Sequence, residues 1–418
     1  MSNYNEETKA INCPYFEDCG ACAYAGMKYD NELAIKNRDM NKLFKDIAKV
    51  EPIVSMYRPI YYRNKVHAVV SADKKGNILM GTYRENSHDV VDIKDCMIED
   101  EVCRSIINTI RELMKSFKYK AYNEDSRQGF IRHILIRRGV VTKEVMLCLV
   151  TGDIAFPSKN NFLKEIRKRH PEITTILQNV NNSKTSMILG KRTVTLYGKG
   201  YIEDVLCGLR FRLGISSFYQ INHDQTEKLY KKAIKLANLT KKDTVIDAYC
   251  GIGTIGMAMS KVAGQVIGVE LNENAIEDAK VNAKLNNIKN IYFQAADAGE
   301  FLVDFAASGR KADVVVMDPP RSGSSPDFLK SILKIKPDRV VYISCNPETQ
   351  VRDIKTLIKG GYKISPVTPF DMFPHTAHTE TVTLLSKLSE AKHYIEVKVD
   401  MDELDLTSAK AKATYKEI

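Results

Sequence analysis

The sequence predicts an α/β fold whose C-terminal half is a Rossmann-type, doubly wound sheet. From residue 223 onward, helical and strand-like segments alternate, which is typical of a parallel sheet covered by helices. A glycine-rich turn, Gly251-x-Gly253-x-x-Gly256, follows one strand-like run and opens a helical one. Two further strand-like runs stop at side chains with reactive chemistry, and ligands bind at such strand ends in open α/β sheets.

The bulk composition limits the class of protein. The chain has 418 residues, 44% of them hydrophobic, which is enough for two or three domains with sizeable cores. Its formal net charge of +10 fits a polyanionic partner such as nucleic acid, although ordinary solubility would explain it too. The polar N-terminus is no signal peptide, and the apolar runs are too short to span a bilayer. We therefore expect a cytoplasmic protein without membrane contact, whose nine cysteines form no disulfides.

We expect four segments along the chain. They are an N-terminal cysteine-containing segment with one helix over residues 1–55, a strand-rich α+β domain over 56–215, the Rossmann-type domain over 216–388 and a C-terminal tail over 389–418. Helices are predicted over 28–48, 156–170 and 223–237 from the spacing of apolar residues. In the Rossmann-type domain, strands are expected at 244–249, 265–270, 291–294, 313–317, 339–344, 362–366 and 381–386, with helices near 254–262, 273–286, 326–335 and 349–358.

Four cysteines suggest a metal cluster. Cys13, Cys19 and Cys22 share a short loop that contains Pro and Gly, and Cys96 follows a strand-like run further on. Thiolates are soft ligands that suit iron–sulfur clusters or zinc. Three clustered thiols with one distant thiol favour a [4Fe–4S] cluster, because zinc modules more often bring their ligands as two close pairs. Free loop cysteines are the simpler alternative, above all for Cys96 taken alone.

Residues 60–155 are rich in strand-like runs that carry basic side chains, with a hairpin turn predicted at Gly76. Basic and aromatic side chains on a sheet can hold phosphates and stack on bases. We therefore predict RNA contacts for Arg63, Lys65 and Arg132. The alternative is an outer face that these side chains merely keep solvated.

Several residues of the C-terminal half suit a nucleotide-like cofactor. Gln220 comes just before a helix cap, in the stretch that enters the Rossmann-type domain. The turn at Gly251 and Gly253 lets the backbone approach a ligand closely, and Glu270 ends the next strand, where a carboxylate accepts hydrogen bonds from ribose hydroxyls. Asp297 follows the third strand and would suit an adenine amino group. A nicotinamide dehydrogenase would show the same pattern.

The sequence Asp318-Pro-Pro-Arg321 separates two kinds of methyl transfer. Enzymes that methylate exocyclic amines need no nucleophile and usually place an aromatic residue where this chain has Arg321. One strand further on, this chain offers Cys345. A thiolate added at carbon 6 of uracil makes carbon 5 enolate-like, so that carbon 5 can take a methyl group from a sulfonium. We therefore predict covalent methyl transfer with Cys345 as nucleophile, and we add Arg321 to the residues expected to contact RNA.

The carbon-5 proton must leave after the transfer, so the reaction needs a base. Glu380, which enters the final predicted strand, is the candidate. The alternative interpretation is that Glu380 is an ordinary surface carboxylate at the start of a strand. His375 and His378 lie close by in the sequence and could suggest a metal site, but no hydrolytic motif accompanies them.

As a set, these motifs resemble the RNA uracil-C5 (5-methyluridine) methyltransferase family. The motifs are Ser-Phe-Tyr-Gln220-Ile-Asn, Asp-Ala-Tyr249-Cys-Gly-Ile-Gly, Gly-Val-Glu270, Asp318-Pro-Pro-Arg, Ser-Cys345-Asn-Pro and Asp371-Met-Phe-Pro-His-Thr-x-His-x-Glu380-Thr-Val, and the match runs from about Cys13 to Leu385. The resemblance implies a Rossmann-type catalytic domain that uses S-adenosylmethionine. It assigns the cofactor site to Gln220, Tyr249, Glu270, Asp297 and Asp318, the nucleophile to Cys345 and the base to Glu380.

The cysteine set resembles the four iron–sulfur ligands of the ribosomal-RNA branch of this family, which the tRNA branch typically lacks. We therefore expect 23S ribosomal RNA as the substrate and keep tRNA as the alternative. Many relatives carry an N-terminal RNA-binding β-barrel before the cluster, and we expect it to be lacking, because only twelve residues precede Cys13. No obligate protein partner is evident, so a monomer is expected.

Two other classes of protein compete with this interpretation. An RNA-binding protein that had lost its activity would not need intact Cys345, Glu380 and Gly251. A nicotinamide oxidoreductase with an iron–sulfur centre would not require the motifs Asp-Pro-Pro-Arg and Ser-Cys-Asn-Pro at the ends of its strands.

Overall fold

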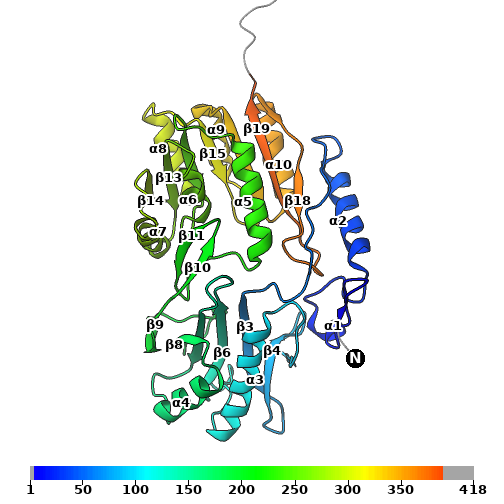
Figure 1. Cartoon of the computed structure of the whole chain (residues 1–418), viewed down its shortest axis with the longest axis vertical. Coiled ribbons are helices and arrows are strands. Elements are labelled where there is room, and N and C mark those ends of the chain that lie inside the picture. Colours follow the sequence, from blue (N-terminus) through cyan, green and yellow to red (C-terminus); the bar gives the residue numbers. More distant parts are fainter. Residues whose placement is uncertain (1–3, 389–418) are drawn as a thin grey trace, which may run out of the picture. The chain divides into compact units, whose positions relative to one another are not determined.

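A computed structural model describes residues 4–388, in which two large sheets carry most of the strands (Figure 1). The predicted C-terminal tail, 389–418, lies outside the described residues. Within the described part of the chain, no helix is long and apolar enough to cross a membrane.

The C-terminal sheet has eight strands in the order β14-β13-β12-β15-β16-β19-β17, with β18 paired to β19. Its elements are α5 (His223–Ala237), β12 (Thr244–Ala248), α6 (Thr254–Ser260), β13 (Gln265–Glu270), α7 (Glu273–Leu285), β14 (Ile291–Ala295), α8 (Ala298–Ala307), β15 (Val314–Met317), α9 (Pro326–Ile335), β16 (Arg339–Ser344), α10 (Pro347–Lys359), β17 (Tyr362–Ile364), β18 (Thr368–Phe370) and β19 (Glu380–Lys387). The predicted alternation of helix and strand is confirmed. The sheet is nevertheless mixed, because β12 to β16 run parallel whereas β19 lies antiparallel between β16 and β17.

The central sheet has seven strands in the order β5-β4-β3-β6-β7-β8-β9. Its elements are β3 (Lys65–Ala72), β4 (Ile78–Tyr83), β5 (Val90–Asp92), α3 (Glu101–Ser116), β6 (Ile131–Arg138), β7 (Val145–Thr151), α4 (Lys159–Arg169), β8 (Ile173–Val180) and β9 (Arg192–Tyr197). Strands β3 and β4 pair antiparallel on either side of Gly76, as the predicted hairpin requires. The α+β character expected for this half is thus confirmed.

Helix α3 was not predicted, although its sequence contains the signals of a helix. The Asp100 side chain accepts hydrogen bonds from the backbone N–H groups of Val102 and Cys103 and caps the first turn. Ile106, Ile110 and the other apolar side chains of α3 recur at helical spacing and are buried against the central sheet.

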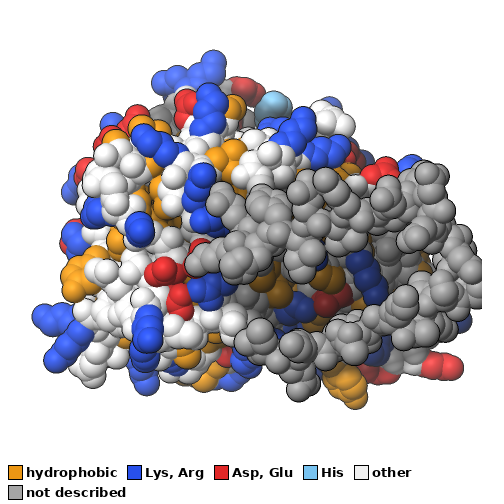
Figure 2. Space-filling view, turned by 90° about the horizontal axis from the view of Figure 1, so that it is seen from above, with side chains coloured by type: hydrophobic (Ala, Val, Ile, Leu, Met, Phe, Trp, Pro, Cys, Tyr) orange, Lys and Arg blue, Asp and Glu red, His pale blue; other side chains and the backbone are white. Residues whose placement is uncertain are grey.

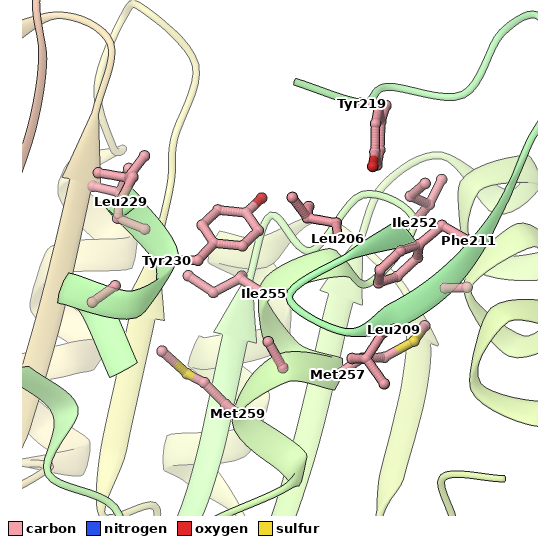
Figure 3. Packing of buried hydrophobic residues seen from close by; sticks show 14 of the residues in the cluster. Leu206, Leu209, Phe211, Tyr219, Leu229, Tyr230, Ile252, Ile255, Met257 and Met259 are labelled. Carbon is pink, nitrogen blue, oxygen red and sulfur yellow. The ribbon is translucent and has the colours of Figure 1, made fainter. Parts of the chain in front are cut away.

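A hairpin of β10 (Ile202–Leu206) and β11 (Leu209–Leu213) joins the central sheet to the C-terminal one. Phe211 from this hairpin packs in one buried cluster with Ile255 of α6 and Leu229 of α5 (Figure 3). Because the hairpin is fixed in this way, the chain that follows it and carries Gln220 enters α5 from a defined position.

The N-terminal segment packs along the C-terminal sheet. It contains β1 (Tyr4–Asn5), β2 (Ala10–Ile11), α1 (Phe16–Cys19) and α2 (Tyr29–Phe44). After α2, bridges pair Val50 with Val367 and Val54 with Phe370, so this stretch runs beside β18. Residues that are distant in the sequence therefore extend the sheet that carries the strand-end motifs.

A buried ion network joins α2 to the loop before β19. Lys36 Nζ donates to Glu32 Oε1 at 2.7 Å and to Asp371 Oδ1 at 2.6 Å, and all three side chains are at most 2% exposed. Tyr29 Oη donates to the other oxygen of Asp371 at 2.5 Å. Glu32 also accepts a hydrogen bond from the backbone N–H of His375 at 2.8 Å. One cation thus holds two carboxylates from different parts of the chain.

We predict that Lys36→Met lowers the free energy of unfolding by about 3–5 kcal/mol, because it leaves two buried carboxylates without their cation. Urea denaturation at neutral pH measures this change. Lys45→Met is the matched control, since Lys45 is the exposed C-cap of α2, and it should stay within about 0.5 kcal/mol of the wild type. A loss for Lys36→Met no larger than that of the control would contradict the prediction.

Candidate active site

Strand pairing brings Cys345 and Glu380 together. The antiparallel pairing of β16 and β19 ends at Ser344 opposite Thr381, and Cys345 and Glu380 are the residues next to this last pair. Asp318 comes directly after β15, the parallel neighbour of β16, and so ends at the same edge of the sheet.

Burial sets the protonation of the two carboxyl groups. Glu380 is 2% exposed, and burial together with the nearby charge of Asp318 raises its pKa to about 8. Burial raises the pKa of Asp318 to about 7. A carboxyl group with a pKa near neutrality can both take up and release a proton under physiological conditions, which suits general base catalysis.

Cys345 is half-buried, and its thiol is held in the protonated form. Burial, followed by the charges of Glu380 and Asp318, raises the pKa of Cys345 to about 11, while the nearby guanidinium of Arg321 acts in the opposite direction. In the free protein the group is therefore a thiol, and attack requires that its proton leaves.

The turns around Cys345 are tied to each other. Asn346 caps α10 by accepting a hydrogen bond from the backbone N–H of Glu348, and Pro347 begins that helix. The Asn346 side chain also donates to the carbonyl oxygen of Arg321 at 2.9 Å. The turn after β15 and the turn after β16 are thereby fixed relative to each other, which holds Cys345 next to Arg321.

An open pocket of about 640 Å³ borders Cys345. It is lined by Asp39, Met40, Lys42, Leu43, Arg321, Cys345, Asn346, Pro347, Glu348, Ala377, His378 and Thr379. Arg321 Nη2 lies 3.4 Å from His378 Nδ1. The pKa of His378 is lowered by partial burial and then by the charges of Arg321, Lys36 and Arg63, so the imidazole is neutral at pH 7. The wall from α2 was not predicted from the sequence.

The predicted cofactor turn borders open space. Gly251 has a φ of 54°, and a Cβ added to it would meet no atom within 4 Å. Its backbone N–H donates to Glu270 Oε2 at 3.1 Å, which ties the turn to the end of β13. Gly253 has a φ of 82°, where a side chain would be strained. The arrangement fits a ligand that approaches the backbone closely, as the cofactor prediction requires.

The other predicted cofactor residues are placed by neighbouring elements. Tyr249, with a φ of 66°, places its ring centroid 5.5 Å from that of Phe328. Asp297 caps α8 by accepting hydrogen bonds from the backbone N–H groups of Gly299 and Glu300 through Oδ1. Gln220 is partly buried, and its backbone carbonyl accepts a hydrogen bond from the Asn64 side chain at 3.1 Å.

Asp247 is a site carboxyl group that the sequence reading missed. It is 1% exposed, and its Oδ2 has no hydrogen-bond partner among the described residues. Burial raises the pKa of Asp247 to about 8. A hydrogen bond from the Gly256 backbone acts to lower this pKa, and the charges of Asp318 and Glu270 raise it further. A carboxylate inside an otherwise apolar strand, just before the glycine turn, was the signal that could have revealed it.

The four predicted cluster ligands lie near one another. Burial raises the pKa of Cys22 to about 12, with contributions from Cys13 and Cys19, and raises that of Cys96 to about 11, with contributions from Cys22 and Cys13. Between residues 4 and 388, however, no group of three or more His, Cys, Asp or Glu side chains is arranged to hold a metal ion. The thiols are neighbours, but the described residues do not bring them together as a metal-binding group, so the predicted cluster is not supported here.

Arg132 must be removed from the predicted RNA-binding residues. It is 3% exposed, its Nε and Nη2 donate to Glu124, and its two Nη atoms also donate to the carbonyl oxygens of Asn181, Ser183 and Thr185. This network occupies all five donors of the guanidinium, so none is left for a phosphate.

Arg63, Lys65 and Arg321 remain candidates for RNA contact, since Arg63 and Lys65 are partly exposed and Arg321 is exposed. Burial, followed by the charge of Arg137, lowers the pKa of Lys65 to about 8. On the face seen from above, Lys and Arg side chains are scattered among neutral ones (Figure 2). The visible part of that face therefore shows no single basic patch.

Comparison with known proteins agrees with this site. A family model described as tRNA (Uracil-5-)-methyltransferase matches residues 191–388, which include Cys345 and Glu380. A second model, described as DNA methylase, matches residues 34–281 and ends before either of them. An uncharacterized RNA methyltransferase of Staphylococcus aureus (strain COL) is 41% identical over 391 residues, which cover 92% of this chain and 86% of the relative. Another uncharacterized RNA methyltransferase, from Halalkalibacterium halodurans, is 41% identical over 378 residues, which cover 89% of this chain and 82% of the relative.

Among solved structures, the chain resembles the tRNA (uracil-54, C5)-methyltransferase of Pyrococcus abyssi, which was determined in complex with S-adenosyl-L-homocysteine. The TM-score is 0.71 and the identity 30%, with 86% of this chain and 84% of that chain covered. The predicted use of S-adenosylmethionine is supported by this match. The chain therefore belongs to the RNA uracil-5 methyltransferase family and is an S-adenosylmethionine-dependent RNA uracil-C5 methyltransferase.

Proposed function

We propose that this enzyme methylates carbon 5 of uridine in 23S ribosomal RNA through a covalent bond between Cys345 and the base. The observation that carries the proposal is the position of Cys345 and Glu380 next to the last pair of β16 and β19, beside an open pocket. A methyltransferase that acts on exocyclic amines needs neither residue.

Cys345 supplies the nucleophile in this proposal. The Cys345 thiol gives its proton to water in the open pocket, and the thiolate adds to carbon 6 of the uracil. The electron pair of the carbon 5–carbon 6 double bond moves to carbon 5, which can then take a methyl group, with S-adenosyl-L-homocysteine as the leaving group. Bound S-adenosylmethionine supplies the methyl group on a sulfonium sulfur. Within the chain, Gln220, Tyr249, Gly251, Gly253, Glu270, Asp297 and Asp318 would hold it.

Glu380 completes the reaction as the base. Its carboxylate takes the proton from the methylated carbon 5, the double bond forms again, and the bond between carbon 6 and the Cys345 sulfur breaks. A pKa raised to about 8 gives the carboxylate a higher affinity for this proton than an exposed glutamate has.

The choice of RNA rests on the cysteine set. Gathered thiols at Cys13, Cys19, Cys22 and Cys96 resemble the ribosomal-RNA branch of the family, which favours 23S ribosomal RNA. The alternative is tRNA, and the likeness to the Pyrococcus abyssi tRNA enzyme favours it.

We further propose that these four cysteines bind a [4Fe–4S] cluster. The packing of Cys22 and Cys96 against one buried cluster supports the proposal, as does the influence of Cys13 and Cys19 on the pKa of Cys22. Thiolates are the usual ligands of such clusters. A cluster here would cross-link the segment before α2 to the loop that carries Cys96.

Variants of Cys345 and Glu380 should stop the reaction at different steps. Glu380→Gln should accumulate a covalent, methylated RNA complex, because loss of a general base costs roughly a hundred- to ten-thousand-fold in rate. Cys345→Ala should form none, because no thiolate attacks. A denaturing gel with labelled S-adenosylmethionine and either a 23S ribosomal RNA fragment or a tRNA measures both.

Cys207→Ala is the matched control for loss of a cysteine outside the pocket, and it should behave as the wild type. An adduct in Cys345→Ala would refute the assigned nucleophile and turn attention to Cys250, beside the cofactor turn. Methylation of tRNA alone would refute the ribosomal-RNA assignment and leave the chemistry intact.

The rate should rise with pH. Glu380 acts as a base only when ionised, and its ionised fraction grows as the pH passes through about 8. The thiolate fraction of Cys345 grows as well, toward a pKa of about 11. The profile of kcat/KM against pH should therefore increase from neutral pH upward. A profile that is flat or falls over this range would contradict the assigned protonation states.

Protein purified without oxygen should be brown and carry about four irons per chain if the cluster forms. Cys22→Ser should lose most of this iron, whereas Cys207→Ser should retain it. Iron analysis and the visible absorption spectrum provide the measurement. A colourless wild-type protein with one zinc would refute the iron–sulfur proposal.

A further inference from the structure

Helix α2 forms one wall of the pocket that contains the nucleophile. Asp39, Met40, Lys42 and Leu43 from this helix line the same pocket as Cys345. The other lining residues come from the turns after β15 and β16 and from the stretch before β19. A segment from the N-terminal part of the chain therefore borders the space in which the reaction is proposed to occur.

This wall is held in place at both ends. In the first half of α2, the buried Lys36 bridges Glu32 and Asp371. In the second half, Phe44 is fully buried in the core of the C-terminal sheet, and Met40 and Leu43 pack against the same core. The position of α2 is thus set by the catalytic domain, so its pocket-facing side chains do not depend on a ligand for their placement.

Lys42 stands out on this wall because its charge is not matched. Asp39 pairs with Arg38, whose Nη2 lies 3.1 Å from Asp39 Oδ1. Lys42 is exposed, and no hydrogen bond or ion pair joins it to another residue between 4 and 388. A lysine in the last turn of a helix also stabilises the helix dipole, but that role does not require a position on the pocket.

We propose that α2 belongs to the RNA-binding surface and that Lys42 binds a backbone phosphate next to the uridine that enters the pocket. The inference rests on the proposed function, since it takes RNA as the substrate. Arg321 lies on the same pocket, so the target nucleotide is flanked by two cationic side chains from segments far apart in the sequence. The ammonium of Lys42 provides a point charge with three donors, which suits a phosphate oxygen.

The test compares Lys42→Ala with the wild type in the full-length protein. RNA binding is measured at several salt concentrations with a ribosomal RNA fragment, together with KM and kcat for methyl transfer. Loss of one phosphate contact should weaken RNA binding and reduce the slope of log affinity against log salt by about 0.7–0.9. KM for RNA should rise with kcat retained, and the affinity for S-adenosyl-L-homocysteine should not change.

Two variants make the result specific. Lys45→Ala removes an equally exposed charge that lies outside the pocket on the same helix, and it should bind RNA as the wild type does. Lys42→Arg keeps the charge and should restore binding. Equal salt slopes for Lys42→Ala and the wild type would overturn the inference. A wild type that does not methylate RNA would instead overturn the proposed function, and a weakened RNA affinity of Lys42→Ala would then still support the phosphate contact.

Discussion

The active-site edge depends on one buried cation. Lys36 lies between Glu32 and Asp371 and ties α2 to the loop that leads into β19. Burial raises the pKa of Asp371, whereas hydrogen bonds from His375 and Lys36 outweigh burial at Glu32 and lower its pKa. Two carboxylates this close would repel each other in a buried setting, so the ammonium is what allows both to stay there. The position of Glu380, a few residues after Asp371, follows from this arrangement.

The antiparallel insertion of β19 determines which residues lie beside Cys345. A wholly parallel sheet would place the start of its last strand at the opposite edge from Cys345. Because β19 runs against β16, its first residue lies beside the last residues of β16. Cys345 comes directly after the last ladder residue of β16, and Glu380 is the first residue of β19, so the ladder between these strands brings the two residues to one edge of the sheet.

Local patterns in the sequence were sufficient to place Cys345, Glu380 and the glycine turn beside strand ends, because the strand residues next to each of them show a clear strand pattern; their catalytic and cofactor roles stay predictions. They were not sufficient for contacts between distant segments. Lys36 and Asp371 are 335 positions apart, and neither has a neighbour that indicates the other. Arg132 shows the same limitation, because its guanidinium is occupied by carbonyl groups of the loop after β8, a circumstance that no pattern around Arg132 reveals.

The elevated pKa of Cys345 has a consequence for the lifetime of the enzyme. A thiolate is the form that peroxides and disulfides attack, and the susceptibility of a cysteine to oxidation follows its thiolate character. With its pKa at about 11, Cys345 remains almost entirely a thiol at neutral pH, although its pocket is open. Burial, together with the nearby carboxyl groups of Glu380 and Asp318, thus keeps Cys345 in the form that resists oxidation while no substrate is bound.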